Sequence, residues 1–365
     1  DALAGVLAQL EGYEAAAGAW ETELLPARID DYSIAWLDDL CRAGRIGWQR
    51  LRPGSGGSGG PLRSTPIVLM PRRHMAFWTS IINGHDKPSM ISSRAQAVFD
   101  TLRQQGALFF DELLHDTGLL RTELENALGE LVAAGRITAD SFAGLRALLM
   151  PAAKREHPRH RRLRRHLLNG IEDAGRWSLL RHAANPQPAE QHAIVRDHAA
   201  EPEALEHIAR SLLRRYGVVF WKLLEREAAW LPSWRQLLRV YQRLEARGEI
   251  RGGRFVEGLV GEQFALPEAI GRLRAIRQAP LDEQLVCLSG SDPLNLVGTV
   301  LVGQRLPAIS STRVLYQDGI PVAALVANQP QWLLEPDATQ RPRWQQALQR
   351  REGGARNPHS VSAPT

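Results

Sequence analysis

Three segments of the chain end a helix in the same way: WLDDLCRAGRIGWQRL (residues 36–51), ALGELVAAGRITADSFAGL (127–145) and LRVYQRLEARGEIRGGRFVEGL (238–259). In each, two large apolar residues lie three positions apart, a glycine follows four positions after the second, and an isoleucine follows two positions after the glycine. The glycines are Gly44, Gly135 and Gly248. The pattern predicts an amphipathic helix that is closed by a glycine in the left-handed conformation and leads directly into a strand.

The residues before the second segment complete the order of a winged-helix domain. Residues 92–105 read as a helix, 107–110 as a short strand and 111–116 as a second helix that Asp111 caps. The third copy repeats this order, whereas the first lacks a clear opening helix. A repeated order of this kind predicts tandem winged-helix domains.

The region after the third copy reads as strands rather than helices. Apolar runs at residues 285–288, 294–302 and 313–325 predict a small antiparallel sheet or barrel. The pair Asp318-Gly319 interrupts the last run and is a strong signal for a hairpin turn. The predicted fold class is therefore α+β, with tandem winged-helix domains followed by a small β-barrel or antiparallel sheet.

The predicted organisation has seven parts. They are a winged-helix-like unit (residues 1–53), a glycine-rich linker with a strand (54–91), a winged helix (92–150), a basic and helical connector (151–201), a winged helix (202–270), a small β-barrel (271–335) and a C-terminal helix with a disordered tail (336–365). Because the chain opens at Asp1 and already reads as folded sequence a few residues later, we expect a piece of a longer protein.

Composition excludes several classes of protein. Apolar residues make up 44% and charged residues 23% of the 365 residues, and no apolar run reaches the roughly 18 residues of a membrane span. The two cysteines, Cys41 and Cys287, are too few for a disulfide framework or a thiolate zinc site. We therefore expect a cytoplasmic, nucleoid-associated protein with no membrane partner.

Motifs for nucleotide hydrolysis and for metal binding are absent from the sequence. No glycine is followed by lysine, which removes the phosphate-binding loop of nucleotide hydrolases. None of the 11 histidines lies in an HExxH or Cys/His ligand pattern. From the sequence we expect neither a cofactor nor a metal ion.

The positive charge of the chain is concentrated in one short run. Net charge is +5, yet residues 154–166 (KREHPRHRRLRRH) hold seven Lys or Arg and one Glu. Arginine clusters of this kind bind nucleic-acid phosphates, although a solvated linker would carry the same charges. We favour the phosphate interpretation because the run joins two winged helices. Its candidate DNA-binding residues are Arg159, Arg161, Arg162, Arg164 and Arg165.

In each winged-helix unit, the helix that ends at the repeated glycine is the recognition helix. The recognition helix of the third unit, which ends at Gly248, carries a second basic feature. Arginines four positions apart share one stripe of a helix, and the apolar residues lie on the opposite side. Such a face suits groove or backbone binding, although an ordinary exposed helix face has the same pattern. The candidates are Arg235, Arg239, Arg243 and Arg247 on the helix, with Arg251 and Arg254 in the wing. The partner we expect is DNA, single-stranded or forked.

Two other features of these units have open alternatives. The second recognition helix (residues 120–134) carries three glutamates, so we interpret it as a scaffold or a protein contact. Three tryptophans of the third unit, Trp221, Trp230 and Trp234, have the side chains to stack on unpaired bases, and core packing is the alternative.

Two carboxylates are candidate catalytic groups. Asp292 lies in the loop SGSDPLNL ahead of Pro293, and Glu262 ends the third wing. A carboxylate beside a DNA-binding unit can stabilise charge on a sugar or orient water. The alternative for Asp292 is a turn residue whose side chain bonds to its own backbone.

Eight blocks of the sequence resemble the C-terminal region of the bacterial large helicase-related (Lhr) family. They cover nearly the whole chain: residues 12–20 (GYEAAAGAW), 25–36 (LPARIDDYSIAW), 64–72 (STPIVLMPR), 175–179 (GRWSL), 216–227 (YGVVFWKLLERE), 247–267 (RGEIRGGRFVEGLVGEQFALP), 292–298 (DPLNLVG) and 313–322 (RVLYQDGIPV). The resemblance implies a superfamily 2 DNA helicase whose motor lies upstream of this segment.

The same region is similar in layout to the AlkZ class of DNA glycosylases, in which winged helices precede a small β-barrel. Residues 264–268 (FALPE) and 288–294 (LSGSDPL) resemble two segments of that class, while the paired-glutamine motif of those enzymes has no clear counterpart. The resemblance thus implies DNA repair, with uracil as the base to be removed.

Two hypotheses follow. In the first, the chain is a DNA-binding module of an Lhr-type repair helicase that also excises uracil, through a carboxylate near the junction of the last winged helix and the barrel. In the second, it is a non-catalytic DNA-binding module that forms homo-oligomers and serves the motor of the same polypeptide. The sequence leaves open whether the chain is an enzyme.

Overall fold

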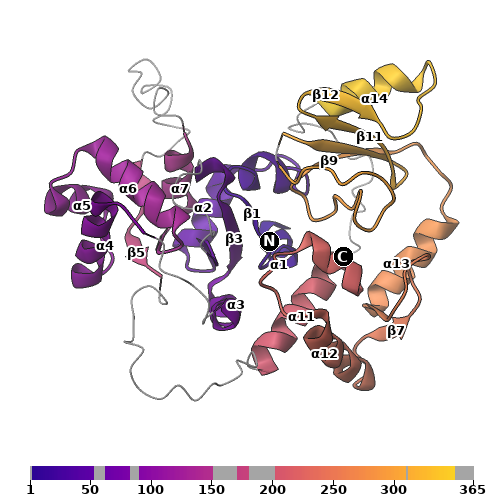
Figure 1. Ribbon diagram of the computed structural model, residues 1–365, viewed down its shortest axis with the longest axis horizontal. Helices are drawn as coiled ribbons and strands as arrows, with labels where there is room; N and C mark the ends of the chain where they lie inside the picture. The colour runs from indigo at the N-terminus through magenta and orange to yellow at the C-terminus, as the bar shows by residue number, and fades with distance from the viewer. Residues whose placement is uncertain are drawn as a thin grey trace, which may run out of the picture. The chain divides into compact units, whose positions relative to one another are not determined.

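The computed structural model describes residues 2–52, 62–82, 90–150, 171–180, 202–309 and 311–349 (Figure 1). The chain divides into two compact units. The larger unit comprises Leu7–Gly18 and Leu37–Ala279, and the smaller comprises Asp1–Val6, Ala19–Trp36 and Pro280–Thr365. All three repeated glycine caps belong to the larger unit.

The predicted glycine caps are confirmed. Helices α2 (Ile34–Arg42), α6 (Arg121–Ala133) and α12 (Trp234–Ala246) each precede a glycine with φ of 69°, 65° and 76° at Gly44, Gly135 and Gly248. In every copy the glycine amide donates to the carbonyl three residues earlier, and the next amide donates to the carbonyl five residues earlier. These two bonds satisfy carbonyls that a helix end would otherwise leave unpaired.

The first winged-helix unit is built around a three-stranded antiparallel sheet in the order β1-β3-β2. Strand β3 pairs with β2 across the glycine-rich stretch at residues 54–60, which lies outside the described residues, so these two strands form the wing. The strands are β1 (Ala15–Ala16), β2 (Ile46–Gln49) and β3 (Pro66–Pro71), and the other elements are η2 (Leu62–Ser64), η3 (Arg72–His74) and α3 (Met75–Ile82). Helix η1 (Trp20–Leu24) belongs to the smaller unit, and the residues of α1 (Ala2–Gln9) are divided between the two units.

The second unit begins with three helices as the sequence predicts. Helix α4 (Ser93–Gln105) is capped by Ser92, whose hydroxyl accepts a hydrogen bond from the Ala95 amide at 3.2 Å. Helix α5 (Phe110–Thr117) starts one residue before Asp111, so Asp111 lies in its first turn and is not its cap. The strand predicted at residues 107–110 is wrong, because only a single bridge forms there, between Leu108 and Trp177.

The wing of the second unit uses a distant strand. Strand β4 (Ile137–Ala139) runs into helix α7 (Phe142–Leu149) instead of a hairpin. Its antiparallel partner is β5 (Trp177–Leu179), which follows η4 (Ile171–Ala174). The second unit therefore keeps the helices of a winged helix but builds its sheet from residues far apart in the chain.

The third unit is a complete winged helix. Helix α11 (Pro202–Tyr216) leads through β6 (Val218–Val219) and the short helix η5 (Trp221–Arg226) to the recognition helix α12. Strands β7 (Arg251–Gly253) and β8 (Gln263–Ala265) form the wing, and the antiparallel sheet has the order β6-β8-β7. Helix α13 (Pro267–Gln278) follows, with Pro267 in its first turn.

The first and third units share one hydrophobic core. Trp78 of α3 and Met70 of β3 pack with Ile208 and Leu212 of α11 and with Tyr241 of α12, and all five are buried. A tryptophan or tyrosine buries about 150–250 Å² of mostly apolar surface. The arrangement fixes α11 and α12 against the first wing.

The smaller unit contains a four-stranded antiparallel sheet in the order β12-β11-β10-β9 (Figure 1). Helix α14 (Gln340–Gln349) packs on one face, where Trp344 and Leu348 contact Leu315 and Val322. The strands are β9 (Leu285–Ser289), β10 (Arg313–Gln317), β11 (Ile320–Val326) and β12 (Gln329–Trp332). The predicted hairpin turn is confirmed, since Asp318 and Gly319 have φ of 49° and 79°.

The sheet does not close into a barrel. Among the described residues β9 pairs with β10 alone and β12 with β11 alone, so both are edge strands. Four strands are too few to wrap around a filled interior. The strand predicted at residues 294–302 is also wrong: the chain makes turns there, joined by one bridge between Val297 and Leu301. No helix in the described part of the chain is both long enough and apolar enough to cross a bilayer.

Candidate nucleic-acid interface

The recognition helix α12 has one buried side and one basic side. Leu237, Val240, Tyr241 and Leu244 are buried in the shared core. The capping box at Ser233 fixes the start of the helix, because the Gln236 side chain accepts from the Ser233 amide at 2.9 Å. The core contacts and the cap together set which residues face solvent.

The arginines predicted to bind DNA lie on the exposed side of this unit. Five of them are exposed and have no ion partner among the described residues: Arg235, Arg239 and Arg243 on α12, and Arg251 and Arg254 in the wing. Unpaired guanidinium groups on a helix and its adjoining wing are free to take phosphate oxygens. We name these five residues the arginine face.

The sixth predicted arginine, Arg247, differs from the others. It forms ion pairs with Glu206 at 2.7 Å and with Glu249 at 2.8 Å. Burial alone would raise the pKa of the Glu206 carboxyl, but Arg210 and Arg247 lower it below its ordinary value. Arg247 therefore helps to hold α12 against α11 and is less available to a phosphate.

Two contacts fix the wing to the recognition helix. The Gly252 amide donates to the Glu245 carboxylate at 3.0 Å, and an added Cβ at Gly252 would approach that carboxylate to 2.4 Å. The buried Gln263 side chain accepts from the amides of Phe255 and Val256 at 2.8 Å and donates to the Val256 carbonyl. The wing loop is thus held by side chains at both of its ends.

An exposed tryptophan lies next to the wing. Trp221 is 46% exposed, and its indole N–H donates to the Val260 carbonyl at 3.2 Å. Trp230 and Trp234 instead pack against the shared core. Of the three tryptophans of this unit, Trp221 is thus the one placed to stack on a base.

The glutamates of the second recognition helix have internal partners. Glu123 caps α6 by accepting from the Leu120 amide and pairs with Arg94 at 2.8 Å. Glu130 accepts from the Ser92 amide and hydroxyl, both at 2.6 Å. Glu125 pairs with Arg121. These contacts favour the interpretation of α6 as a scaffold.

The two candidate carboxylates lie in different surroundings. Asp292, in the smaller unit, is 1% exposed and forms a two-point ion pair with Arg28, at 2.7 Å and 3.0 Å. Its Oδ1 also accepts from the Leu294 amide at 2.9 Å. This is the side-chain contact expected if Asp292 is a turn residue. Glu262, in the larger unit, is exposed at the end of the wing, directly before β8.

The predicted arginines of the basic run at residues 154–166 lie outside the described residues: Arg159, Arg161, Arg162, Arg164 and Arg165. The contact of Arg28 with Asp292 could not be predicted from the sequence, because 264 positions separate the two residues. Only the fold brings these two residues together.

Comparison with known proteins points to one family. Two models described as winged-helix domains of the large helicase-related protein match residues 1–72 and 198–285. A protein of Mycolicibacterium smegmatis named Lhr helicase/probable uracil glycosylase is 30% identical over an alignment of 355 residues, gaps included, that covers 92% of this chain and 22% of that protein. The Lhr helicase/uracil glycosylase of Escherichia coli is 31% identical over 334 residues, 84% of this chain and 20% of its own length. The chain thus spans about a fifth of these relatives.

Proposed function

Since the chain belongs to the large helicase-related family and corresponds to part of its C-terminal region, we propose that it is the DNA-binding module of an Lhr-type repair helicase. The observation that carries this proposal is the arginine face. In the full protein this module would hold DNA for the motor of the same polypeptide. The family match supports the presence of winged-helix domains, and the exposed arginines support DNA as the partner.

The arginine face suits the DNA backbone better than base edges. Residues 235 and 243 are two helical turns apart, about 12 Å along the axis, and phosphates of one strand are spaced about 3.4 Å along a duplex. Several phosphates therefore fall within reach of one helix face. Arginine can bind the edge of guanine, but readout of a mixed sequence also uses Asn or Gln on adenine, and neither is part of the arginine face. We therefore expect binding with little sequence preference.

The first prediction concerns salt. If the five arginines of the face each neutralise one phosphate, the plot of log K against log[salt] should have a slope of at least about −3.5 on single strands and about −4.5 on duplex. Fluorescence anisotropy with labelled DNA between 50 mM and 300 mM salt, without ATP, measures it. A slope near zero would remove the electrostatic basis of the proposal.

The second prediction is that the triple variant Arg235→Glu, Arg239→Glu and Arg243→Glu loses DNA affinity by about 100-fold or more at 0.1 M salt. Each lost phosphate contact costs roughly 8-fold under these conditions, before any repulsion. Because the three side chains are exposed, the midpoint of thermal unfolding should stay within a few degrees.

A matched control variant distinguishes the effect of where the arginines lie from the effect of the net charge on DNA affinity. Helix α13 carries Arg272, Arg274 and Arg277, which are also exposed and have no ion partner in the described part of the chain. Their replacement by glutamate changes the net charge by the same amount. We expect a loss of affinity at least tenfold smaller than that of the α12 variant, and equal losses would place the interface elsewhere.

A second candidate function is base excision. The names of both relatives include uracil glycosylase, and we propose that this chain removes uracil from DNA that the arginine face holds. A carboxylate is needed to stabilise the positive charge that develops on the sugar. Asp292 is the first choice and Glu262 the reserve. Because Arg28 covers Asp292, the carboxylate would have to be released from this pair to reach a sugar.

A further inference from the structure

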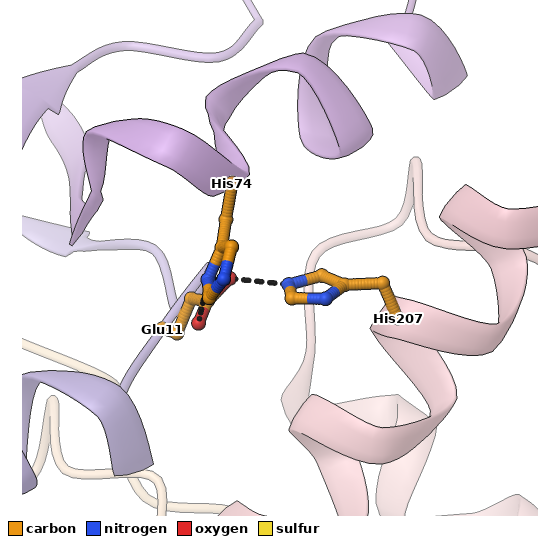
Figure 2. A group of neighbouring side chains, drawn as sticks. All are labelled: Glu11, His74 and His207. Atoms are coloured by element: carbon orange, nitrogen blue, oxygen red, sulfur yellow. Dashed lines mark hydrogen bonds and ion pairs between the residues drawn. The ribbon is translucent and has the colours of Figure 1, made fainter.

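A buried carboxylate and two imidazoles, none of them part of the arginine face, come together in the larger unit. Figure 2 shows Glu11, from the loop after α1, beside His74 in η3, with a dashed contact to His207 in α11. His74 Nδ1 lies 3.0 Å from Glu11 Oε2, and His207 Nε2 lies 2.5 Å from Glu11 Oε1. The two imidazole ring centres are 4.4 Å apart.

The surroundings hold these three groups in place. Glu11 is fully buried, and its Oε1 also accepts from the Trp78 indole N–H at 2.9 Å. The adjacent Gly12 has φ of 76°, and an added Cβ there would lie 2.1 Å from the Trp78 ring. Any residue other than glycine would therefore displace the tryptophan that orients the carboxylate.

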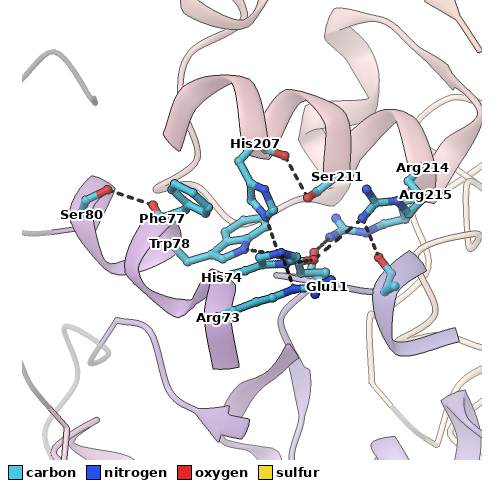
Figure 3. A network of polar contacts seen from close by, with 11 residues as sticks. Glu11, Arg73, His74, Phe77, Trp78, Ser80, His207, Ser211, Arg214 and Arg215 are labelled. Carbon is cyan, nitrogen blue, oxygen red and sulfur yellow. Dashed lines mark hydrogen bonds and ion pairs between the residues drawn. The ribbon is translucent and has the colours of Figure 1, made fainter. Parts of the chain in front are cut away.

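The wider network is shown in Figure 3. Ser211 donates to the His207 carbonyl at 3.0 Å, and Arg73 donates to His74 Nε2 at 3.1 Å. Arg214 lies 3.8 Å from Glu11 Oε2 and is largely exposed. Burial alone would raise the pKa of Glu11, but the contacts from His207 and Trp78 lower it to about 2.

We propose that Glu11, His74 and His207 form a binding site for a divalent transition-metal ion of the zinc class. One ligand atom from each residue lies within 4.8 Å of the other two. Two imidazoles and one carboxylate are a donor set that zinc accepts, whereas magnesium and calcium require mainly oxygen ligands. This site goes beyond the proposed function and departs from the sequence-based expectation of no metal.

The two distances from the histidines to Glu11 are close to those of a loaded site, whereas His74 Nδ1 and His207 Nε2, which lie within 4.8 Å of each other, would have to approach. Zinc binds imidazole nitrogen and carboxylate oxygen at about 2.0–2.2 Å, so ligand atoms around one ion lie about 3.3 Å apart. The contact between Glu11 and His207 would lengthen by less than about 1 Å. Both histidines are partly exposed, at 20% and 15% of their side chains, which leaves a route for the ion and a position for water.

Binding requires three local adjustments. His207 must give up the proton that Nε2 shares with Glu11 and keep a proton on Nδ1. His74 must carry its proton on Nε2 when Nδ1 binds the metal, so Arg73, which is exposed, has to turn away from the ring. The ion also adds positive charge near Arg214, which can move into solvent. The site would fasten the first winged-helix unit, through η3, to helix α11 of the third.

The test is metal binding by the full chain after removal of metals with a chelator. We expect one equivalent of Co²⁺ to bind with the visible absorption of a low-coordinate site, and Zn²⁺ to displace it. The variant His207→Gln should lose this equivalent, with a fall in zinc affinity beyond the roughly 10–100-fold that loss of an outer-shell partner causes. All other histidines remain in the variant. His115→Gln, at an exposed position of α5, serves as the control.

A second measurement uses the unmodified chain and does not depend on how the variant folds. Carbethoxylation of the histidines, followed by peptide mapping, should show that Zn²⁺ slows the reaction of His74 and His207 at least tenfold and leaves His115 unchanged. Equal reaction rates with and without zinc, or equal metal binding by the unmodified chain and His207→Gln, would show a purely hydrogen-bonded cluster and overturn the proposal.

Discussion

Replacement of Asp292 by asparagine is expected to slow uracil excision by about 100-fold or more while DNA affinity stays within about twofold. Asparagine keeps the size of the side chain but removes the negative charge that would stabilise a positively charged sugar. The arginine face lies in a different unit from Asp292, so binding should be retained. The measurement is single-turnover cleavage of single-stranded DNA that contains one uracil, with alkaline treatment of the product and enzyme in excess.

The ion pair with Arg28 calls for a control on folding. Because Asp292 is buried, its replacement leaves Arg28 without its carboxylate, and thermal unfolding has to be followed beside excision. Arg28→Lys keeps a positive charge beside Asp292 and leaves the carboxylate unchanged. Glu262→Gln tests whether Glu262, the reserve candidate, is the catalytic carboxylate. Excision by Asp292→Asn at the original rate would make Asp292 a turn residue. No excision by the unmodified chain would favour the non-catalytic binding module.

The largest expected effect on stability comes from a second buried ion pair. Arg215 of α11 and Glu227 are bonded to each other with both side chains 1% exposed. Arg215 also donates to the Glu11 carbonyl at 2.5 Å, and Tyr216 donates to Glu227 at 2.8 Å. Burial alone would lower the pKa of the Arg215 guanidinium, but Glu227 raises it above its ordinary value.

Arg215→Met should therefore lower the free energy of unfolding by about 3–5 kcal/mol, because it leaves the Glu227 carboxylate buried without its cation. Denaturant unfolding followed by tryptophan fluorescence measures the change. Arg247→Met is the matched control: the Arg247 side chain is about half exposed, and we expect a loss of less than about 1 kcal/mol.

The double variant Arg215→Met with Glu227→Gln tests the cause. It removes both charges, so part of the stability should return relative to Arg215→Met alone. A change below about 1 kcal/mol in Arg215→Met would mean that the pair contributes little to folding.

Local patterns allowed the fold to be predicted where one segment decides its own structure. The caps at Gly44, Gly135 and Gly248 and the turn at Asp318 follow from residues within a few positions of each other, and all are present. The prediction of a strand at residues 294–302 was wrong because apolar composition alone does not distinguish a strand from packed turns. There the backbone of Gly298 approaches Arg305 so closely that an added Cβ would lie 2.2 Å away.

The groups brought together by the fold could not be predicted in this way. Arg28 meets Asp292 across 264 positions, and Glu11 meets His207 across 196. No spacing rule connects residues at such separations, because their contact depends on how whole units pack. The arginine face was predictable since its helix members recur every four residues and its wing members follow directly.

The side-chain contacts that hold the wing and its loop near the recognition helix α12 have a consequence for the proposed binding of DNA. Because Glu245 and Gln263 fix the wing loop at both ends, the backbone segments that carry the arginines of α12 and of the wing keep a constant separation. In the proposed complex this fixed spacing limits adjustment to different groove widths, so part of the cost of adjustment would be carried by the DNA. Bending energy depends on sequence and on strand continuity, and single strands, gaps and flexible pyrimidine–purine steps deform most easily. The module would thereby select DNA by its stiffness without reading the edges of bases.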